Sequence, residues 1–326
     1  MTQESAPPHP YQDRSAGLIV FGVLTILIGL FCALIIPAML FGSAQSAASA
    51  PAGRGQLLSA AGVYGTLAVA LVWLGIGSIM ARRWARALLL LGAWTWLLVG
   101  VMAMIFLAVL LPQIASAIPS HGPSGPLSDK ARLAILLLPA GVIFFLGVVL
   151  PGIWVIFYRG SNVRATCEHR DPVTRWTDRC PLPVLAVSLW LAAGALSMVL
   201  GALGPGRVVP FFGTFLHGSG GLAALLAVAA LWLYAARACY RLQPAGWWII
   251  VVCIGLFAVS HFLTYSQHEI AETYHLMGYG PEQIAQIEKF QFLNSRTFAW
   301  MPVLWLVPSL AYLGYVRRYF PKPIRR

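Results

Sequence analysis

The sequence has little charge. Only 10% of its 326 residues are Asp, Glu, Lys or Arg, and 59% are hydrophobic, whereas globular domains average roughly 25% charged residues. This composition excludes a secreted enzyme, and it excludes a soluble nucleic-acid-binding domain. A mean hydropathy of +0.77 indicates instead that most side chains face lipid, where apolar groups carry no hydration penalty.

Cysteines and catalytic motifs are also scarce. The five cysteines are an odd number, which argues against a disulfide framework. The sequence contains no P-loop, no GxSxG nucleophile elbow, no HExxH zinc motif and no carboxylate pair inside an apolar run. The absence of acids and lysines inside these runs also disfavours an ion-coupled carrier, because such carriers use intramembrane charges.

Eight apolar runs are long enough to cross about 30 Å of hydrocarbon as helices. Backbone groups in lipid must be paired within their own segment, so the sequence predicts an all-α polytopic membrane protein with eight transmembrane helices. The runs are residues 17–41, 59–80, 87–111, 133–157, 182–203, 211–235, 246–266 and 297–316. The internal prolines, which we expect to kink these helices rather than end them, are Pro37, Pro139, Pro151, Pro302 and Pro308.

Lysine and arginine gather at one end of these spans. The positive-inside rule then predicts a bacterial-type inner-membrane protein with both termini in the cytoplasm. The net charge of +12 is therefore interpreted as topology and contact with the lipid bilayer, with an acidic protein partner as the alternative and no nucleic acid. The basic residues on this side are Arg14, Arg82, Arg83, Arg86, five arginines of the 159–181 loop, Arg237, Arg241, Arg317, Arg318, Lys322, Arg325 and Arg326.

The first span resembles a signal peptide because the small residues 48–50 that follow it look like a cleavage site. Its apolar run of about 25 residues is longer than a typical signal-peptide core. The preceding tail carries only Arg14 as a basic residue. We therefore expect an uncleaved anchor, with cleavage as the alternative.

The two halves of the chain follow the same plan, which suggests two parallel four-helix repeats, residues 17–158 and 182–316. Aligning residues 62–111 with 217–266 pairs Arg82 with Arg237 and Gly100 with Gly255, among nine identities. The remaining predicted segments are the cytoplasmic tail 1–16, the cytoplasmic loop 159–181, an outer cap at 267–296 and the basic tail 317–326.

Histidine and glutamate recur at the end of the seventh span and after it. If the helix continues beyond the membrane, one stripe at spacings of four, three, four and three contains His261, Tyr265, His268, Glu272 and His275. Glu272 and His275 have a spacing that metal sites of helical bundles use. We predict a divalent metal site formed by His268, Glu269, Glu272 and His275. Ordinary solvated residues are the alternative.

Two histidines are expected at matching depth in successive spans. His217 lies about six residues inside the sixth span and His261 about five inside the seventh, so both should be roughly 8–9 Å deep. Such a pair suits a haem held from opposite faces, a metal or a quinone head group. Haem is therefore a candidate cofactor, and an interfacial role without a ligand is the alternative.

The outer cap should contain a short amphipathic helix. Gly280 followed by Pro281 marks a helix start, and apolar residues recur at 284, 287 and 290–293. Such a helix lies in the membrane interface or covers the bundle. The corresponding 112–131 loop is rich in proline and should be irregular.

The 159–181 loop carries a second set of candidate ligands. Cys167, His169 and Cys180 are zinc-binding residue types, and Asp178 is available as a fourth ligand. No CxxC pair is present, so an ordered loop packed on the inner face is the alternative. Cytoplasmic thiols remain reduced, which disfavours a disulfide.

These features favour a non-enzymatic scaffold, sensor or accessory subunit with a membrane or cytoplasmic protein as its partner. One alternative is a redox or metal-dependent membrane protein that uses the outer histidines. Another is a small-molecule transporter whose pathway lies between the two repeats.

Overall fold

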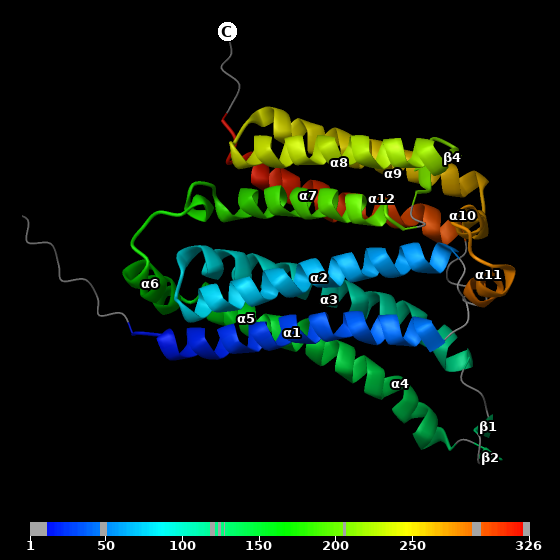
Figure 1. Cartoon of the computed structure of the whole chain (residues 1–326), viewed down its shortest axis with the longest axis horizontal. Coiled ribbons are helices and arrows are strands. Elements are labelled where there is room, and N and C mark those ends of the chain that lie inside the picture. The colour runs from blue at the N-terminus through cyan, green and yellow to red at the C-terminus, as the bar shows by residue number, and fades with distance from the viewer. Residues whose placement is uncertain are drawn as a thin grey trace, which may run out of the picture. The chain divides into compact units, whose positions relative to one another are not determined.

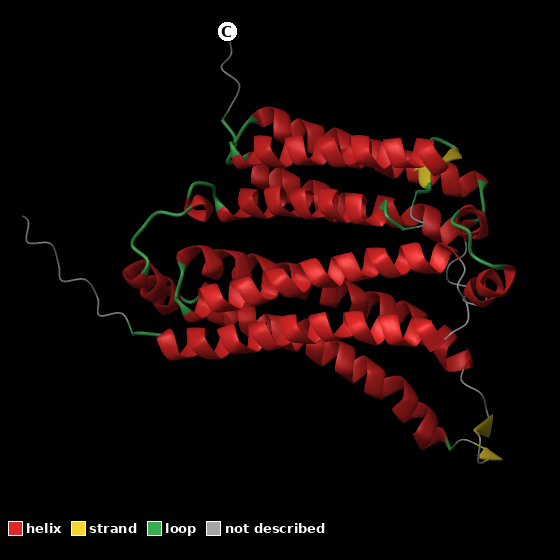
Figure 2. Cartoon of the chain, viewed as in Figure 1, coloured by secondary structure: helices red, strands yellow, loops and turns green. Residues whose placement is uncertain are grey.

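The computed structural model describes residues 12–45, 51–117, 121–122, 125–126, 128–204, 207–288 and 295–321 (Figure 1). Most of this described part is helical, and its strands form two short hairpins (Figure 2). Within it, eight helical segments are long and apolar enough to cross a membrane. The prediction of an all-α polytopic membrane protein is confirmed at this level.

The spans and their connections have the following bounds. The spans are α1 (Ser15–Gln45), α2 (Pro51–Ile79), α3 (Arg83–Ala117), α4 (Asp129–Phe144) continued through the π-helix η1 (Phe145–Val149) into α5 (Leu150–Arg159), α7 (Leu182–Gly201), α8 (Gly218–Tyr240), α9 (Pro244–Gln267) and α12 (Ser295–Arg317). The shorter helices are α6 (Ser161–Arg170), η2 (Trp176–Asp178), α10 (Ile270–Leu276) and α11 (Pro281–Glu288). The strands are β1 (His121–Gly122), β2 (Gly125–Pro126), β3 (Val209–Phe211) and β4 (Thr214–Leu216).

Contacts within the chain define two units. Unit 1 consists of residues 1–27 and 71–177, and unit 2 consists of residues 28–70 and 178–326. Helices α1 and α2 each contribute residues to both units. The two four-helix repeats that the sequence suggests stay a prediction.

The internal prolines do not stop the spans. Helices α1, α4 and α12 continue past Pro37, Pro139, Pro302 and Pro308. Pro151 is different, because it is the second residue of α5, and only Leu150 separates it from the π-helix η1. In η1 the Leu150 N–H bonds to the carbonyl of Phe145, five residues back, which is the π-helical pattern.

Two glycines bring α1 and α2 into close contact in unit 1. A Cβ atom added at Gly75 would lie 2.6 Å from the carbonyl oxygen of Gly22, and one added at Gly22 would lie 2.8 Å from that of Gly75. Real Cβ contacts are longer, so only glycine permits this crossing. Small residues at helix crossings are typical of membrane proteins, where van der Waals packing drives association.

A buried hydrogen-bond chain fixes α5 against the same crossing. The Ser78 hydroxyl donates to the carbonyl of Leu18 at 3.0 Å and lies 2.7 Å from the Tyr158 hydroxyl. Because serine has one hydroxyl hydrogen, Tyr158 must be the donor in the second bond. The Tyr158 side chain is fully buried, and the Phe21 ring stacks on Phe157 at 4.2 Å beside it.

Four spans of unit 2 form a closed bundle. Helix α7 packs on α8, α8 on α9, and α9 on α12. The circle closes where the Tyr312 hydroxyl of α12 donates to the carbonyl of Pro183 in α7, at 3.0 Å. We call the end where α8 passes into α9 the basic end, defined by Arg237, Arg241, Arg317 and Arg318. We call the opposite end, which carries β3 and β4, the hairpin end.

The turns that join α2 to α3 and α8 to α9 have the same geometry. Their middle residues, Ala81 and Leu242, have φ of 51° and 56°. The next residue in each turn donates its N–H to the carbonyl five residues back, as in a Schellman motif. These turns match at an offset of 161 residues, six more than the 155 that pairs Arg82 with Arg237 in the sequence alignment.

Two predictions about the loops have clear outcomes. The amphipathic helix predicted to start at Pro281 is confirmed as α11 (Pro281–Glu288), and the expected apolar residues 290–293 lie outside the described residues. The 112–131 loop is less irregular than expected. Helix α3 continues to Ala117, and β1 pairs with β2 in antiparallel fashion, His121 opposite Pro126.

Candidate functional site

A short hairpin precedes α8 where the sequence predicted the start of a span. Strands β3 and β4 pair Val209 with Leu216 and Phe211 with Thr214. The two turn residues, Phe212 and Gly213, have φ of 43° and 92°, as a type I′ hairpin turn requires. The predicted sixth span, residues 211–235, is therefore placed too early, since α8 begins at Gly218.

Two hydroxyl groups of α9 hold this hairpin. Ser260 accepts the N–H of Phe212 at 2.9 Å and donates to the carbonyl of Pro210 at 2.9 Å. Thr264 accepts the N–H of Gly213 at 3.1 Å. Both side chains are buried, so these bonds satisfy the backbone groups of the turn in the interior. The hairpin is thereby fixed to one face of α9.

The continuous helix expected from His261 to His275 is wrong. Helix α9 ends at Gln267, because His268 and Glu269 have extended backbone angles, and α10 then begins at Ile270. A hydrogen bond of 3.0 Å between the hydroxyls of Tyr265 and Thr273 links the two helices across the break.

His268 links three elements at the hairpin end. Its Nδ1 lies 2.8 Å from Oε2 of Glu272 in α10, and its Nε2 lies 3.0 Å from the carbonyl oxygen of Gly213 in the hairpin. The ring of Phe215 is 5.2 Å away, measured between centroids. A carboxylate and a carbonyl only accept hydrogen bonds, so both ring nitrogens must donate. The geometry is therefore that of a protonated imidazolium.

The electrostatics of His268 agree with this geometry. The hydrogen bond to the Glu272 carboxylate raises the pKa of His268 above its ordinary value, and the bond to the Gly213 carbonyl adds to the effect. Both partners stabilise the charged form of the ring. The side chain of His268 is 31% exposed, so solvent protons reach it.

His261 has a different environment. It is 7% exposed, and its ring lies 4.5 Å from the ring of Tyr265, 5.0 Å from that of Phe298 and 5.9 Å from that of Phe257. Its Nδ1 is buried without a hydrogen-bond partner.

His217 does not share the depth of His261. It is the N-cap residue of α8, with extended backbone angles, and its side chain is exposed. The expected matching depth is wrong because the hairpin occupies the residues assigned to the first turns of the span. A haem held by this pair of histidines stays a prediction.

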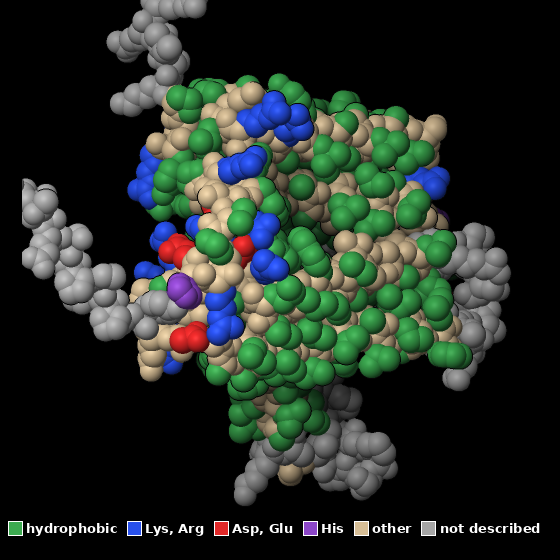
Figure 3. Space-filling model, turned by 60° about the vertical axis from the view of Figure 1, so that its left-hand side comes forward, with side chains coloured by type: hydrophobic (Ala, Val, Ile, Leu, Met, Phe, Trp, Pro, Cys, Tyr) green, Lys and Arg blue, Asp and Glu red, His purple; other side chains and the backbone are tan. Residues whose placement is uncertain are grey.

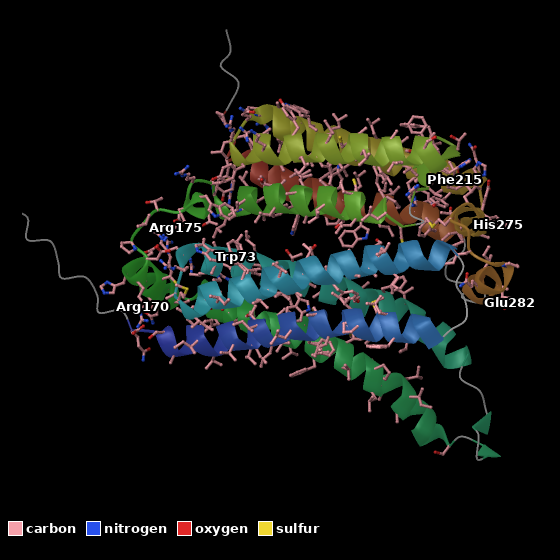
Figure 4. All side chains as sticks on the ribbon, viewed as in Figure 1. Trp73, Arg170, Arg175, Phe215, His275 and Glu282 are labelled. Atoms are coloured by element: carbon pink, nitrogen blue, oxygen red, sulfur yellow. The ribbon has the colours of Figure 1, made fainter. Side chains whose placement is uncertain are left out.

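The remaining residues of the predicted metal site lie on the surface. Glu269 is the exposed N-cap of α10, and His275 is exposed in its last turn. Figure 4 labels His275 and Phe215 at the same end of unit 2. Among the described residues, no three His, Cys, Asp or Glu side chains are grouped as metal ligands. His268 and Glu272 do meet, and a metal at this place stays a prediction.

The cysteines of the predicted zinc site are buried in their own units. Cys167 is buried on α6 of unit 1, whereas His169, two residues later on that helix, is exposed, and Cys180 precedes α7 in unit 2. Burial raises the pKa of both thiols to about 11. Zinc binds the thiolate form, so these environments do not favour a metal. The zinc site stays a prediction.

Asp171 is the residue that organises the 159–181 loop, and the sequence analysis missed it. Its carboxylate is 1% exposed and receives the guanidinium of Arg175 at 2.7 Å and 3.1 Å. It also accepts the backbone N–H of Arg83 at 3.3 Å and lies 3.7 Å from Arg82. These contacts, Arg175 first, lower the pKa of Asp171. The alternation of acids and arginines in the loop was the available signal.

The sequence analysis also missed Ser260 and Thr264. They are four residues apart, which places two hydroxyl groups on one face of an otherwise apolar helix, and His268 follows directly after that helix. That pattern was a readable signal. Comparisons of the chain with protein-family models, with curated proteins and with solved structures find no match.

Proposed function

We propose that the chain is a non-enzymatic sensor of a bacterial-type inner membrane, with both termini in the cytoplasm and the hairpin end of unit 2 outside. The basic residues at the other end of the spans support this orientation. The signal proposed is external pH. The observation that carries the proposal is the double hydrogen bond of His268, whose two acceptors belong to the hairpin and to α10.

Loss of the His268 proton removes one of these two bonds. A neutral imidazole has one N–H, so either the Gly213 carbonyl or the Glu272 carboxylate loses its donor. The other charged or titratable side chains belong to α9, to α10 and to the residues beside the hairpin. They are Cys253, His261 and Tyr265 of α9, Glu269, Tyr274 and His275 of α10, and Arg207 and His217 beside the hairpin. Within the described part of the chain, none of these side chains forms a hydrogen bond with His268.

The direction of the pH response follows from the raised pKa. The imidazolium stabilises the docked hairpin, so its contribution is complete below the ordinary histidine pKa of about 6.5. It is lost as pH rises through the higher pKa of the folded state. An acidic exterior therefore keeps the hairpin docked, and a more alkaline exterior releases it.

Hydrogen–deuterium exchange of the full chain in detergent tests the proposal. Exchange of the 207–217 amides, corrected for the intrinsic pH dependence, should rise between pH 5.5 and pH 8.5. His268→Gln should abolish this pH dependence. His275→Gln, an exposed histidine on the same helix, is the matched control and should retain it. Equal protection of the wild-type hairpin at both pH values would refute the proposal.

A second candidate function, redox or metal chemistry, rests on the unpartnered Nδ1 of His261. A buried nitrogen lone pair without a donor is a site for a metal, a haem iron or a hydroxyl group. An absorption spectrum with elemental analysis of the purified protein tests this candidate. A Soret band, or one metal per chain that His261→Ala removes, would support it, and a colourless and metal-free preparation would count against it.

A further inference from the structure

The arginines of the two units have opposite electrostatic surroundings. In unit 1 the arginines around α6 are neutralised by carboxylates at N–O distances of 2.8, 3.3 and 2.7 Å. The pairs are Arg164 with Glu168, Arg170 with Asp13 and Arg175 with Asp171. These charges are therefore satisfied within the protein.

The four arginines of the basic end of unit 2 have no such partners. Within the described part of the chain, Arg237, Arg241, Arg317 and Arg318 form no ion pair. Unit 2 contains five acidic residues. Asp178 precedes α7, and the other four follow α9: Glu269, Glu272, Glu282 and Glu288. In Figure 3, Lys and Arg lie beside Asp and Glu in one region and among hydrophobic side chains in another.

Aromatic rings hold two of these arginines in place. The guanidinium carbon of Arg317 lies 5.1 Å from the ring centroid of Trp247, whose indole N–H is bonded to the carbonyl of Leu313 at 2.8 Å. That of Arg318 lies 3.8 Å from the ring centroid of Tyr315. Such cation–π contacts orient a guanidinium without neutralising it. Tyr and Trp with Arg at the end of a span are typical of the lipid headgroup level.

We propose that the basic end of unit 2 binds the phosphate groups of anionic phospholipids. Guanidinium groups match phosphate oxygens with two parallel hydrogen bonds, and the four charges need an anionic partner. Below the arginines the same surface is apolar, with Leu233 and Trp248 more than half exposed. An acyl chain that continues from the phosphate covers such a surface, whereas an acidic protein segment does not.

The inference is tested by lipid binding to the full chain in detergent. Native mass spectrometry measures the apparent affinity for phosphatidylglycerol relative to phosphatidylcholine. The test variant is Arg241→Gln with Arg318→Gln. The matched control is Arg164→Gln with Arg170→Gln, which removes the same charge from neutralised pairs in unit 1. All four side chains are substantially exposed, so both variants should fold, which circular dichroism verifies.

The expected outcome is a preference of the wild type for phosphatidylglycerol that the test variant loses by about 25-fold, or about fivefold per arginine. The control should retain the preference. A variant with Arg241→Lys and Arg318→Lys should retain part of it, because charge remains but the forked geometry is lost. Absence of a wild-type preference, or equal loss in test and control, would overturn the proposal. So would arginine-dependent binding of poly-glutamate without binding of the lipid.

Discussion

Gly100 of α3 faces the backbone of η1, and one added methyl group there should have a measurable cost. A Cβ atom at Gly100 would overlap the carbonyl oxygen of Gly147 and lie 2.7 Å from its Cα. No side chain can rotate away, so α3 and η1 must separate. Overpacking of this kind costs about 3 kcal/mol, offset by about 1 kcal/mol of better helix propensity for alanine. Gly100→Ala should therefore destabilise unit 1 by about 2 kcal/mol.

Gly92 provides the control on the same helix. A Cβ atom there would have no neighbour within 4 Å, so Gly92→Ala keeps only the gain in propensity, about 1 kcal/mol. Thermal unfolding in detergent should show a Tm about 4–8 °C lower for Gly100→Ala and about 2–4 °C higher for Gly92→Ala. Shifts of the same sign and size in both variants would refute the close approach of α3 and η1.

Three further predictions concern hydrogen bonds. Ser260→Ala should leave the Phe212 N–H and the Pro210 carbonyl unpaired, which costs about 1–3 kcal/mol of stability. The amides of the hairpin should then exchange hydrogen faster. Unchanged exchange would show that these two bonds are not needed to hold the hairpin. Glu272→Gln should lower the pKa of His268, because it removes the carboxylate that stabilises the charged ring. NMR titration of the histidines measures this pKa. An unchanged pKa would contradict a stabilising role of Glu272. Ser78→Ala should destabilise the protein by about 1–3 kcal/mol, because it leaves the buried Tyr158 hydroxyl without an acceptor, whereas Tyr158→Phe should cost only about 1 kcal/mol. Thermal unfolding measures both losses. A larger loss for Tyr158→Phe than for Ser78→Ala would contradict Tyr158 as the donor.

The spans were predictable because lipid imposes one strong rule on the sequence. A run of apolar residues in the membrane must pair its own backbone groups and therefore forms a helix. All eight helical segments follow from this rule, including α12, which contains Pro302 and Pro308. The start of α11 was also readable, since Pro281 supplies a local signal that does not depend on packing.

The hairpin end was not predictable because it depends on contacts between distant residues. Hydropathy assigns residues 211–216 to the start of the sixth span, since Phe211, Phe212 and Phe215 are apolar. They form a hairpin because Ser260 and Thr264, about 50 residues later, satisfy the turn's backbone groups. The break at His268 also involves the hairpin, since the His268 side chain is hydrogen-bonded to the Gly213 carbonyl.

The 159–181 loop illustrates a third case. Residue types there suggested zinc, but a thiol is a metal ligand only if its environment favours the thiolate. Burial of Cys167 does the opposite. The polar partner of greatest structural consequence, Asp171, meets Arg82 and Arg83 across 88 residues or more of sequence, and no local pattern encodes that distance.

The π-helix η1 determines which side of α5 meets α3. A π-turn holds one more residue than an α-turn, so it rotates everything after it by about 100° relative to an uninterrupted α-helix. With that rotation in place, Trp154 and Tyr158 are buried. A single deletion within Phe145–Val149 would therefore remove the extra residue and convert the π-turn to an α-turn, so Tyr158 would still face Ser78. A single insertion between Val149 and Tyr158 would instead turn Tyr158 away from Ser78 by about 100°. The number of residues in this stretch, rather than the chemistry of their side chains, thus determines which face of α5 packs within unit 1.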